Sequence, residues 1–498
     1  MKILRFKRFG VSLLCMCLVL IMSACILLPT GSVDDGGGDD SVTGGDDGTP
    51  TYAVEINPDK NAALELTVSV SGDAHERKII EELGKGFQKE YPNITFKIDP
   101  ISGNIYDTVM GYYRANRMPD LLMANSFSML TLGAAKVVAG LDPYIEAETQ
   151  NGTFDADDYY ADFWKLGQRN FDGTQWMVPR AADQVVVHYN KSILRAAGVD
   201  LDPATTKVKN GWTWRDFLDV CARVRSYYDG HGMGNLYLID SYLNWEANFN
   251  AILRSCGAEY WGEGDAGAIV SENTKTALNL MKDLVEKKYT AKFSGASQAN
   301  FDGGQGAFLF HSRASSLTWN ILKEVTAVKN ELGGGAAPED IYDVATFPLI
   351  GDSPKIGAGA AGYCVAATID ASRRDYAWQF LKFMLSRDGQ NIIAECGANY
   401  PPIRKDMADP TAEGVSWGLN LGFNLDAYTW AARQGYACAT DFILKRPAMA
   451  QDLIDAVNTM IKNYVDYTPA QGSADANAKL DREMQYCRES LEYWAFDA

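Results

Sequence analysis

Histidine is scarce in this chain of 498 residues, and the sequence patterns of several enzyme classes are missing. The four histidines, His75, His188, His231 and His311, are scattered and give no metal-ligand spacing. No C-x-x-C pair occurs, which excludes a zinc knuckle or a redox dithiol by spacing. Patterns of the H-E-x-x-H and P-loop types are also absent. We therefore expect no metal and no cofactor, while the 64 acidic residues leave open a pair of carboxylates of the kind that a glycosidase uses.

Beyond its N-terminal region the chain also lacks an apolar run of about 20 residues, the length that a membrane-spanning helix needs. The N-terminus itself has a basic head, an apolar run at 11–22, and then Met22-Ser23-Ala24-Cys25. This order is typical of a secretory signal, and the cysteine after small residues resembles a bacterial lipobox, with Met22 where Leu is commoner. We predict a signal peptide at 1–24 and a lipidated (palmitate-bearing) Cys25. The alternatives are a plain signal peptide cut after Ala24, or an uncleaved anchor.

Acyl chains on Cys25 would hold the chain at the outer face of the cell membrane without a spanning helix, since each buried CH₂ contributes about 0.8 kcal/mol. The formal net charge is −18, and loss of the signal with its four basic residues would make it −22. So acidic a protein is not expected to bind nucleic acid through its phosphates. The predicted partners are therefore the membrane, through the anchor, and a small molecule.

Six cysteines remain once the signal and the anchor are set aside: Cys221, Cys256, Cys364, Cys396, Cys438 and Cys487. Export permits disulfides, but six cysteines in a chain of this length do not require them. The sequence favours buried free thiols over a structural disulfide.

The segment after Cys25 contains Gly31 to Pro50, which has no aromatic residue and only two aliphatic ones. Such a composition cannot bury enough surface to fold. Its Asp-Gly pairs lack the ordered carboxylates and the final Glu of a calcium loop. We predict that 25–62 is a disordered tether.

The region from 63 to 498 is too long for a single core and fits two lobes. Leu64 to Val70 alternates apolar and polar residues, whereas Glu76 to Tyr91 has apolar residues at helical spacing. Strand signals follow at 94–98 and 120–124, with a helical segment at 106–115 between them. This alternation predicts an α/β fold with a parallel sheet and helices on both faces.

Several patches occur in the order and spacing seen in the extracellular solute-binding proteins of family 1, the group that includes maltose-binding protein. They are M-P-D-L-L at 118–122, W-M-V-P-R followed by V-V-V-H-Y-N-K at 176–191, W-T-W-R-D-F at 212–217, F-D-G-G-Q-G-A-F at 301–308, A-W-Q-F-L-K-F-M-L-S at 377–386 and G-A-N-Y-P-P at 397–402. The resemblance covers nearly all of residues 63–470.

The resemblance implies a two-lobed, periplasmic-binding-protein-like fold of type II, with crossover strands between the lobes and a ligand cleft at the crossing. Aligned by order, lobe 1 would hold 63–187 and 362–402, and lobe 2 would hold 188–361 and 403–498. It also implies a monomeric protein that captures a solute, most readily an oligosaccharide, for the permease subunits of an ABC transporter. A sensor of the same fold is an alternative. A surface glycosidase is a weaker one, because the resemblance to binding proteins implies no catalytic residue.

A sugar site needs polar groups for the hydroxyl rim and flat aromatic rings for the C–H faces. The loops after the expected strands and the crossover segments supply such residues. The candidates for ligand binding are Asp73, Asn104, Asn125, Arg180, Asp183, Trp245, Arg313, Trp319, Gly359 and Trp430, with Glu246 and Ala360 beside them.

Each candidate also has a structural explanation. Asp73, Asn104 and Asn125 could instead cap helices or satisfy turns. Arg180 and Asp183 could pair with one another, and the tryptophans could be core residues, as Trp378 is expected to be from its helical spacing with other apolar residues.

One motif is a false signal. Residues 357–362 read G-A-G-A-A-G, which matches the dinucleotide fingerprint, but that fingerprint needs a helix after it and here a strand-like run follows at 363–369. We interpret the glycines as the approach to a crossover strand with backbone close to the ligand.

Overall fold

The computed structural model describes residues 43–44, 50–51, 53–72, 74–101, 103–168, 173–240, 244–259, 266–294, 301, 304–312, 342–398, 400–417, 424–438 and 450–496. All of them belong to one compact unit that starts at Thr43. Cys25 and the candidates Asp73, Arg313 and Trp319 lie outside the described residues.

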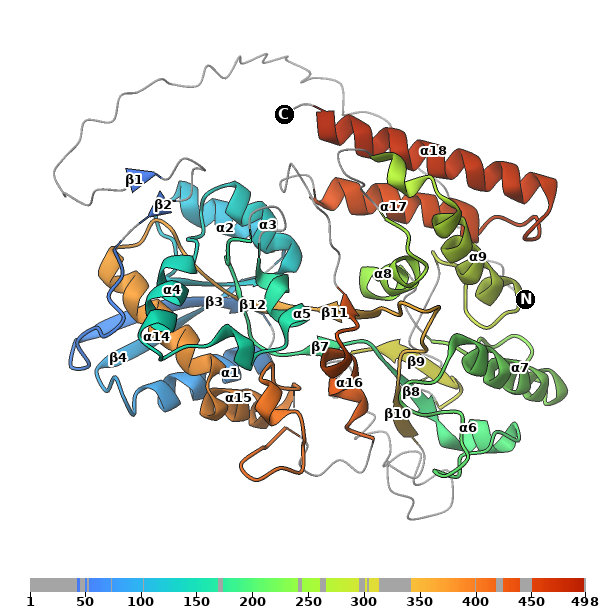
Figure 1. Ribbon diagram of the computed structural model, residues 1–498, viewed down its shortest axis with the longest axis horizontal. Helices are drawn as coiled ribbons and strands as arrows, with labels where there is room; N and C mark the ends of the chain where they lie inside the picture. The colour runs from blue at the N-terminus through green and yellow to red at the C-terminus, as the bar shows by residue number, and fades with distance from the viewer. Residues whose placement is uncertain are drawn as a thin grey trace, which may run out of the picture. The chain divides into compact units, whose positions relative to one another are not determined.

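The described elements build two groups, which Figure 1 shows on either side of the strands β7 and β11. The first group contains the helices α1 (Ala74–Phe87), α2 (Ile105–Arg114), α3 (Ser126–Ala134), α4 (Asp142–Gln150), α5 (Ala161–Trp164), α14 (Ala371–Leu385) and α15 (Arg387–Ile393). The second contains α6 (Lys191–Ala196), α7 (Trp214–Gly230), α8 (Glu246–Ser255), α9 (Glu272–Glu286), α16 (Ala427–Gln434), α17 (Ala450–Val465) and α18 (Ala474–Phe496). Single turns of other helix types occur at Ala156–Asp158, Lys165–Gly167, Ala266–Ile269, Ala394–Ala398 and Lys405–Met407.

A five-stranded sheet forms the centre of the first group. Its order is β4 (Ile94–Ile101), β3 (Leu64–Ser71), β5 (Leu121–Asn125), β12 (Ala361–Val365) and β6 (Val178–Pro179). The prediction of a parallel sheet is confirmed for β4, β3 and β5, which the helices α1 and α2 connect. The strand β12 runs antiparallel to both β5 and β6, because it enters from the second group and not through a crossover helix.

The second group has an antiparallel sheet in the order β10 (Tyr342–Thr346), β8 (Val186–Asn190) and β9 (Phe308–His311). A third small sheet, β13 (Ala437–Cys438), β11 (Ile356–Gly359) and β7 (Asp183–Gln184), lies where the chain passes between the groups. A further two-residue pair joins β1 (Thr43–Gly44) to β2 (Pro50–Thr51).

Each group has its own hydrophobic core. One core extends over 66–182 and 358–403, with Ala432 and Ala437, and we call the part around it lobe 1. The other extends over 185–356 and 454–491, with Ala431, and we call that part lobe 2. The residue boundaries predicted from the sequence remain a prediction, but the switch from one core to the other occurs at the short strands β7 and β11.

Local sequence patterns explain the main elements. In α1 the side chains of Ile79, Ile80, Leu83 and Phe87 are buried, as their helical spacing predicts. The prediction that Trp378 is a core residue is also confirmed, since its side chain is fully buried. Of the six cysteines expected to be thiols, Cys221, Cys364, Cys396 and Cys487 are free and buried, Cys256 is free and partly buried, and Cys438 is buried.

Residues at the end of the predicted tether contact lobe 1. The backbone N–H of Glu55 donates to the Asp375 carboxylate at 3.2 Å, and the Gln379 side chain donates to the carbonyl of Ile56 at 2.9 Å. The Tyr376 hydroxyl donates to the carbonyl of Asp59 at 2.9 Å. The N-terminal segment therefore reaches the folded unit along α14.

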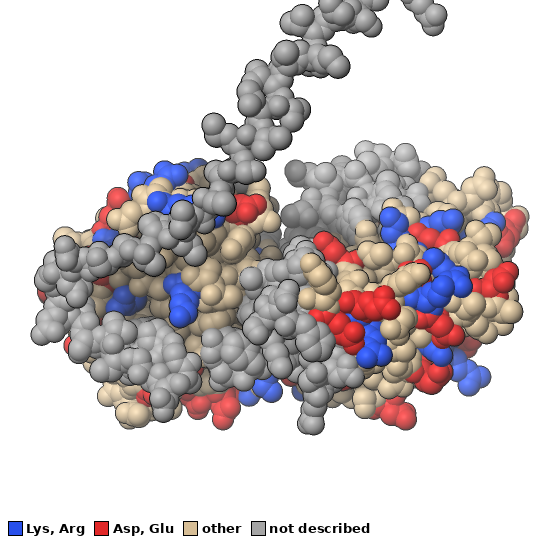
Figure 2. Space-filling model, turned by 90° about the horizontal axis from the view of Figure 1, so that it is seen from above, with Lys and Arg blue, Asp and Glu red and all other residues tan. Residues whose placement is uncertain are grey.

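Charged residues are mixed on the surface. Figure 2 shows Asp and Glu interspersed with Lys and Arg over the described part of the face that it presents. None of the helices within the described ranges is long and apolar enough to cross a membrane.

The G-A-G-A-A-G segment forms the end of β11 and the start of β12, so a strand and not a helix follows it. A Cβ on Gly357 would lie 1.8 Å from the carbonyl oxygen of Ala247 in α8, and one on Gly362 would lie 2.1 Å from that of Val178. A Cβ on Gly359 would meet nothing within 4 Å. Two of the glycines are therefore needed for close backbone packing, and the third faces open space.

We expect Gly357→Ala to lower the free energy of unfolding by about 1–3 kcal/mol, because the added methyl group must push α8 away from β11. Gly359→Ala is the matched control, and its effect should stay within about 0.5 kcal/mol. Urea unfolding of the full chain would measure both. Equal unfolding midpoints for the two variants would contradict the proposed packing.

Candidate ligand-binding site

A cavity of about 230 Å³ lies at the crossing between the lobes. Its walls come from the end of β5, the segment from β6 to the start of β7, the start of α8, the β11–β12 connection and the loop that contains Tyr400. The lining residues are Asn125, Arg180, Ala181, Asp183, Trp245, Glu246, Ala247, Ala358, Gly359, Ala360, Ala361 and Tyr400.

Five sequence candidates meet around this cavity: Asn125, Arg180, Asp183, Trp245 and Gly359. The strand pairing explains part of the convergence. Asp183 of β7 lies directly opposite Gly359 of β11, and Asn125 of β5 lies opposite Ala361 of β12. Whether these residues bind a ligand remains a proposal.

Arg180 is the most constrained group of the site. Its Nη2 lies 2.6 Å from Oε1 of Glu76, and both side chains are almost fully buried. The guanidinium carbon lies 4.3 Å from the ring centre of Tyr400, a cation–π contact. Burial opposes the positive charge, but the neighbouring Glu76 carboxylate outweighs burial, and the pKa of Arg180 is raised. Arg180 therefore stays charged, with Glu76 as its counter-ion.

One N–H group of the Arg180 guanidinium makes no hydrogen bond within the described part of the chain. This group is the buried Nε–H. A buried donor without an acceptor costs about 1–3 kcal/mol.

Trp245 supplies the aromatic surface of the cavity. It stands directly before α8, and its indole stacks on the imidazole of His311, with ring centres 4.7 Å apart and planes at 28°. The Nδ1 of His311 accepts a hydrogen bond from the backbone N–H of Ser312 at 2.8 Å. Burial lowers the pKa of the His311 imidazole to about 4, so the ring under Trp245 is neutral near pH 7.

Carboxyl and amide groups complete the polar lining. Burial raises the pKa of Glu246, which begins α8. Asn125 is the N-cap of α3, where its Oδ1 accepts from the Ser128 backbone N–H at 2.8 Å. The capping explanation therefore holds for Asn125, and the residue lines the cavity as well.

Two candidates do not reach this cavity. Asn104 caps α2, with its side chain accepting from the Asp107 backbone N–H at 3.1 Å. Trp430 on α16 packs against Tyr436 and lies close to Gly211 in lobe 2. Neither lines the cavity at the crossing.

The sequence did not reveal Glu76 or the aromatic role of Tyr400. Glu76 occupies the first turn of α1, a place where an acid normally faces solvent and interacts with the helix dipole. Tyr400 belongs to the G-A-N-Y-P-P patch, but nothing in that patch indicates a stack on Arg180. No group of three potential metal ligands gathers within the described ranges.

Comparisons with known proteins agree with this geometry. The family model described as bacterial extracellular solute-binding protein matches residues 72–391. The sn-glycerol-3-phosphate-binding periplasmic protein of Rhizobium meliloti is 21% identical over 377 residues, which cover 72% of this chain and 80% of that protein.

Solved structures show the same fold. An ABC substrate-binding protein of Listeria monocytogenes in complex with cycloalternan has a TM-score of 0.62 at 18% identity, covering 86% of this chain and 100% of that one. The GacH receptor of Streptomyces glaucescens, solved unliganded and with acarbose, also has a TM-score of 0.62 at 18% identity, covering 88% and 100%. The predicted two-lobed fold class is confirmed.

The low pKa of His311 predicts a loss of stability in acid. The imidazole has its usual pKa of about 6.5 when unfolded and about 4 when folded, so the unfolded state binds the proton first as the pH falls. The contribution of His311 should therefore decline between about pH 6.5 and 4, by roughly 3 kcal/mol in all. Denaturant unfolding of the full chain and of His311→Gln, measured across this range, should show a weaker acid dependence in the variant. Identical pH profiles would contradict the burial of a neutral His311.

Proposed function

This chain belongs to the bacterial extracellular solute-binding protein family, and from that premise we propose that it captures a neutral carbohydrate, an oligosaccharide in particular, and delivers it to an ABC importer. The family places the chain outside the cytoplasm. The proposed binding site is the cavity at the crossing, and the proposed solution state is a monomer.

The observation that carries this proposal is the combination of Trp245 with polar groups that converge from both lobes. An indole face suits the C–H face of a sugar ring, and the Arg180 guanidinium, the Asn125 amide and the carboxyl groups of Asp183 and Glu246 suit its hydroxyl groups. Because Asn125 and Arg180 belong to lobe 1 and Trp245 and Glu246 to lobe 2, a ligand here would bridge the lobes. Bridging favours a closed arrangement that a permease can distinguish from the empty one.

The charges at the cavity support a neutral ligand over a phosphate ester. Arg180 is the one cation among the described lining residues, and Glu76 already neutralises it at 2.6 Å. Two acidic side chains, Asp183 and Glu246, share the lining. An anionic ligand such as glycerol phosphate would face net repulsion, whereas a sugar hydroxyl can donate to either carboxylate.

Both roles that we consider for the chain are binding roles without a chemical reaction. Ligand capture is common to a transport protein and to a sensor that presents the ligand to a receptor, and the family favours transport. We also propose that Cys25 carries the lipid that holds the protein at the outer face of the cell membrane.

We expect a saccharide to raise the melting temperature of the full chain. At 100 times its dissociation constant it should add about 2.7 kcal/mol of stability. Trp245→Ala should weaken its binding by about 10- to 100-fold, because the aromatic surface is lost. Trp430→Ala is the matched control, a tryptophan of lobe 2 outside the cavity, and should leave the affinity unchanged. A shift produced by glycerol phosphate and not by sugars would overturn the ligand class.

Cys25→Ser should move the chain from the membrane fraction into the soluble extracellular fraction, since the acyl chains supply the attachment. Incorporation of labelled palmitate into the parent chain, and its loss in the variant, would measure the modification. Cys256→Ser, at a partly buried free thiol, is the control and should keep the label. Retention of label in Cys25→Ser would contradict the proposed anchor.

A further inference from the structure

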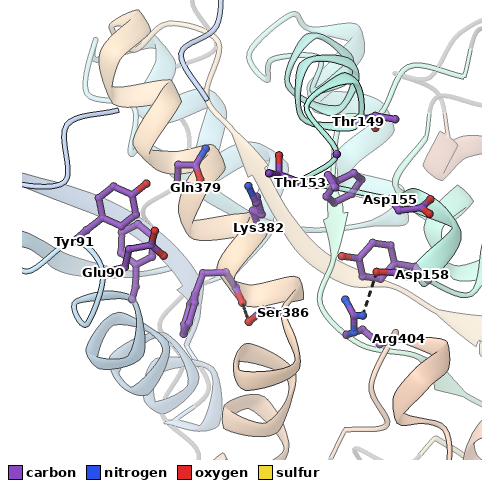
Figure 3. Close-up of a pocket in the computed structure, with 15 residues that line it drawn as sticks. Glu90, Tyr91, Thr149, Thr153, Asp155, Asp158, Gln379, Lys382, Ser386 and Arg404 are labelled. Carbon is purple, nitrogen blue, oxygen red and sulfur yellow. Dashed lines mark hydrogen bonds and ion pairs between the residues drawn. The ribbon is translucent and has the colours of Figure 1, made fainter. Parts of the chain in front are cut away.

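A second cavity, of about 650 Å³, lies within lobe 1 and shares no residue with the cavity at the crossing. Figure 3 shows it between three groups of side chains: Glu90 and Tyr91 after α1, Gln379 and Lys382 on α14 with Ser386 at its end, and Thr149 to Asp158 at the end of α4 and after it. Its size falls within the roughly 300–1,000 Å³ that small-molecule sites occupy. From its lining we propose that this cavity binds a neutral saccharide, as a site separate from the one at the crossing.

Aromatic rings form the walls. Tyr91 stacks on Phe87, with ring centres 4.6 Å apart and planes at 14°, and Phe383 lies beside Phe87 at 6.0 Å. On the other side, Phe154 contacts Tyr159 at 5.7 Å. All five rings line the cavity. Phe87, Tyr91, Phe154 and Tyr159 are at most 7% exposed, so they form a rigid apolar wall behind the polar groups of the cavity and not an open stacking surface.

Beneath the lining residues lies the buried carboxylate of Glu148, which is 1% exposed. It accepts hydrogen bonds from Lys382 at 2.6 Å, from Gln379 at 3.0 Å and from the Thr153 hydroxyl. Burial alone would raise the pKa of Glu148, but these donors outweigh it and lower the pKa. Groups from α14 and from the loop after α4 are thereby fixed in place before any ligand arrives, which reduces the entropy cost of binding.

The charges favour a neutral ligand. The lining contains the cations Lys382 and Arg404 and the acids Glu90, Asp155 and Asp158. Lys382 is paired with Glu148 at 2.6 Å, and Arg404 with Asp158 at 3.1 Å and with Asp406 at 2.8 Å. An anion would have to displace these partners. Hydroxyl groups can instead use the remaining N–H bonds of Lys382 and the rim carboxylates of Asp155 and Asp158.

The test uses the full chain in detergent, with Trp245→Ala to weaken the site at the crossing. Neutral di- and trisaccharides at millimolar concentration are screened by saturation-transfer NMR. We expect binding that persists in this background and that the further change Thr149→Trp weakens at least ten-fold, because the exposed Thr149 lies at the rim and a large ring there fills the cavity. Gln150→Trp, at the neighbouring exposed position that does not line the cavity, should have no effect.

The outcomes separate the two sites. Thr149→Trp in the parent chain should leave binding at the crossing unchanged, so failure of one site does not imply failure of the other. Asp155→Trp is a second blocking variant in case Thr149→Trp lowers the melting temperature. Retention on an insoluble neutral polysaccharide would identify a polymer as the source of the sugar, and binding of soluble saccharides alone would identify free ones. The proposal is overturned if no saccharide binds the Trp245→Ala chain, or if both blocking variants fold and leave that binding intact.

Discussion

The buried ion pair between Glu76 and Arg180 is the interaction on which the arrangement of the crossing depends. It joins the first turn of α1 to the point where the chain leaves lobe 1, with 2.6 Å between the charged atoms and almost no exposure of either side chain. Removing one partner of such a pair typically costs 3–5 kcal/mol, because the other charge stays buried. Tyr400 covers the guanidinium, and Gln390 donates to the Arg180 carbonyl at 3.0 Å. The pair therefore fixes both the backbone of the crossover and one wall of the cavity.

The crossing strands impose a second constraint, which is close backbone packing. β11 pairs with β7 and β13 while it lies against α8, and Gly357 permits that contact because a side chain there would overlap the Ala247 carbonyl. The same contact holds the start of α8, and with it Trp245 and Glu246, next to the strands that carry Asp183 and Gly359. The geometry of the site thus follows from the absence of side chains at the crossing as much as from the side chains that line it.

Sequence periodicity predicted the strands β3, β4 and β5 and the helices α1 and α2, and the family resemblance predicted the two-lobed fold. Only some of the predicted ligand-binding residues line the cavity at the crossing, and their role in binding remains a proposal. Asn104 and Asn125 look alike in the sequence, since each follows a strand and caps the next helix. They differ in the sheet order: β5 borders the crossing strand β12, whereas β4 is an edge strand two positions further away. Strand order depends on contacts between distant segments, which a local pattern does not contain. Glu76 was missed for the same reason, because its partner is over a hundred positions away.

The two cavities share an electrostatic design that bears on what they can bind. In each, the cations of the wall are paired with carboxylates of the protein: Arg180 with Glu76 at the crossing, and Lys382 with Glu148 within lobe 1. Cations that are already neutralised contribute oriented N–H donors but little net charge, and the chain as a whole carries −18. At the proposed sites recognition would then rest on directed hydrogen bonds and apolar contacts, both of which salt screens weakly compared with a long-range charge attraction. A protein built in this way can hold polyhydroxylated neutral molecules over a wide range of ionic strength, as a binding protein exposed to the medium outside the cell must.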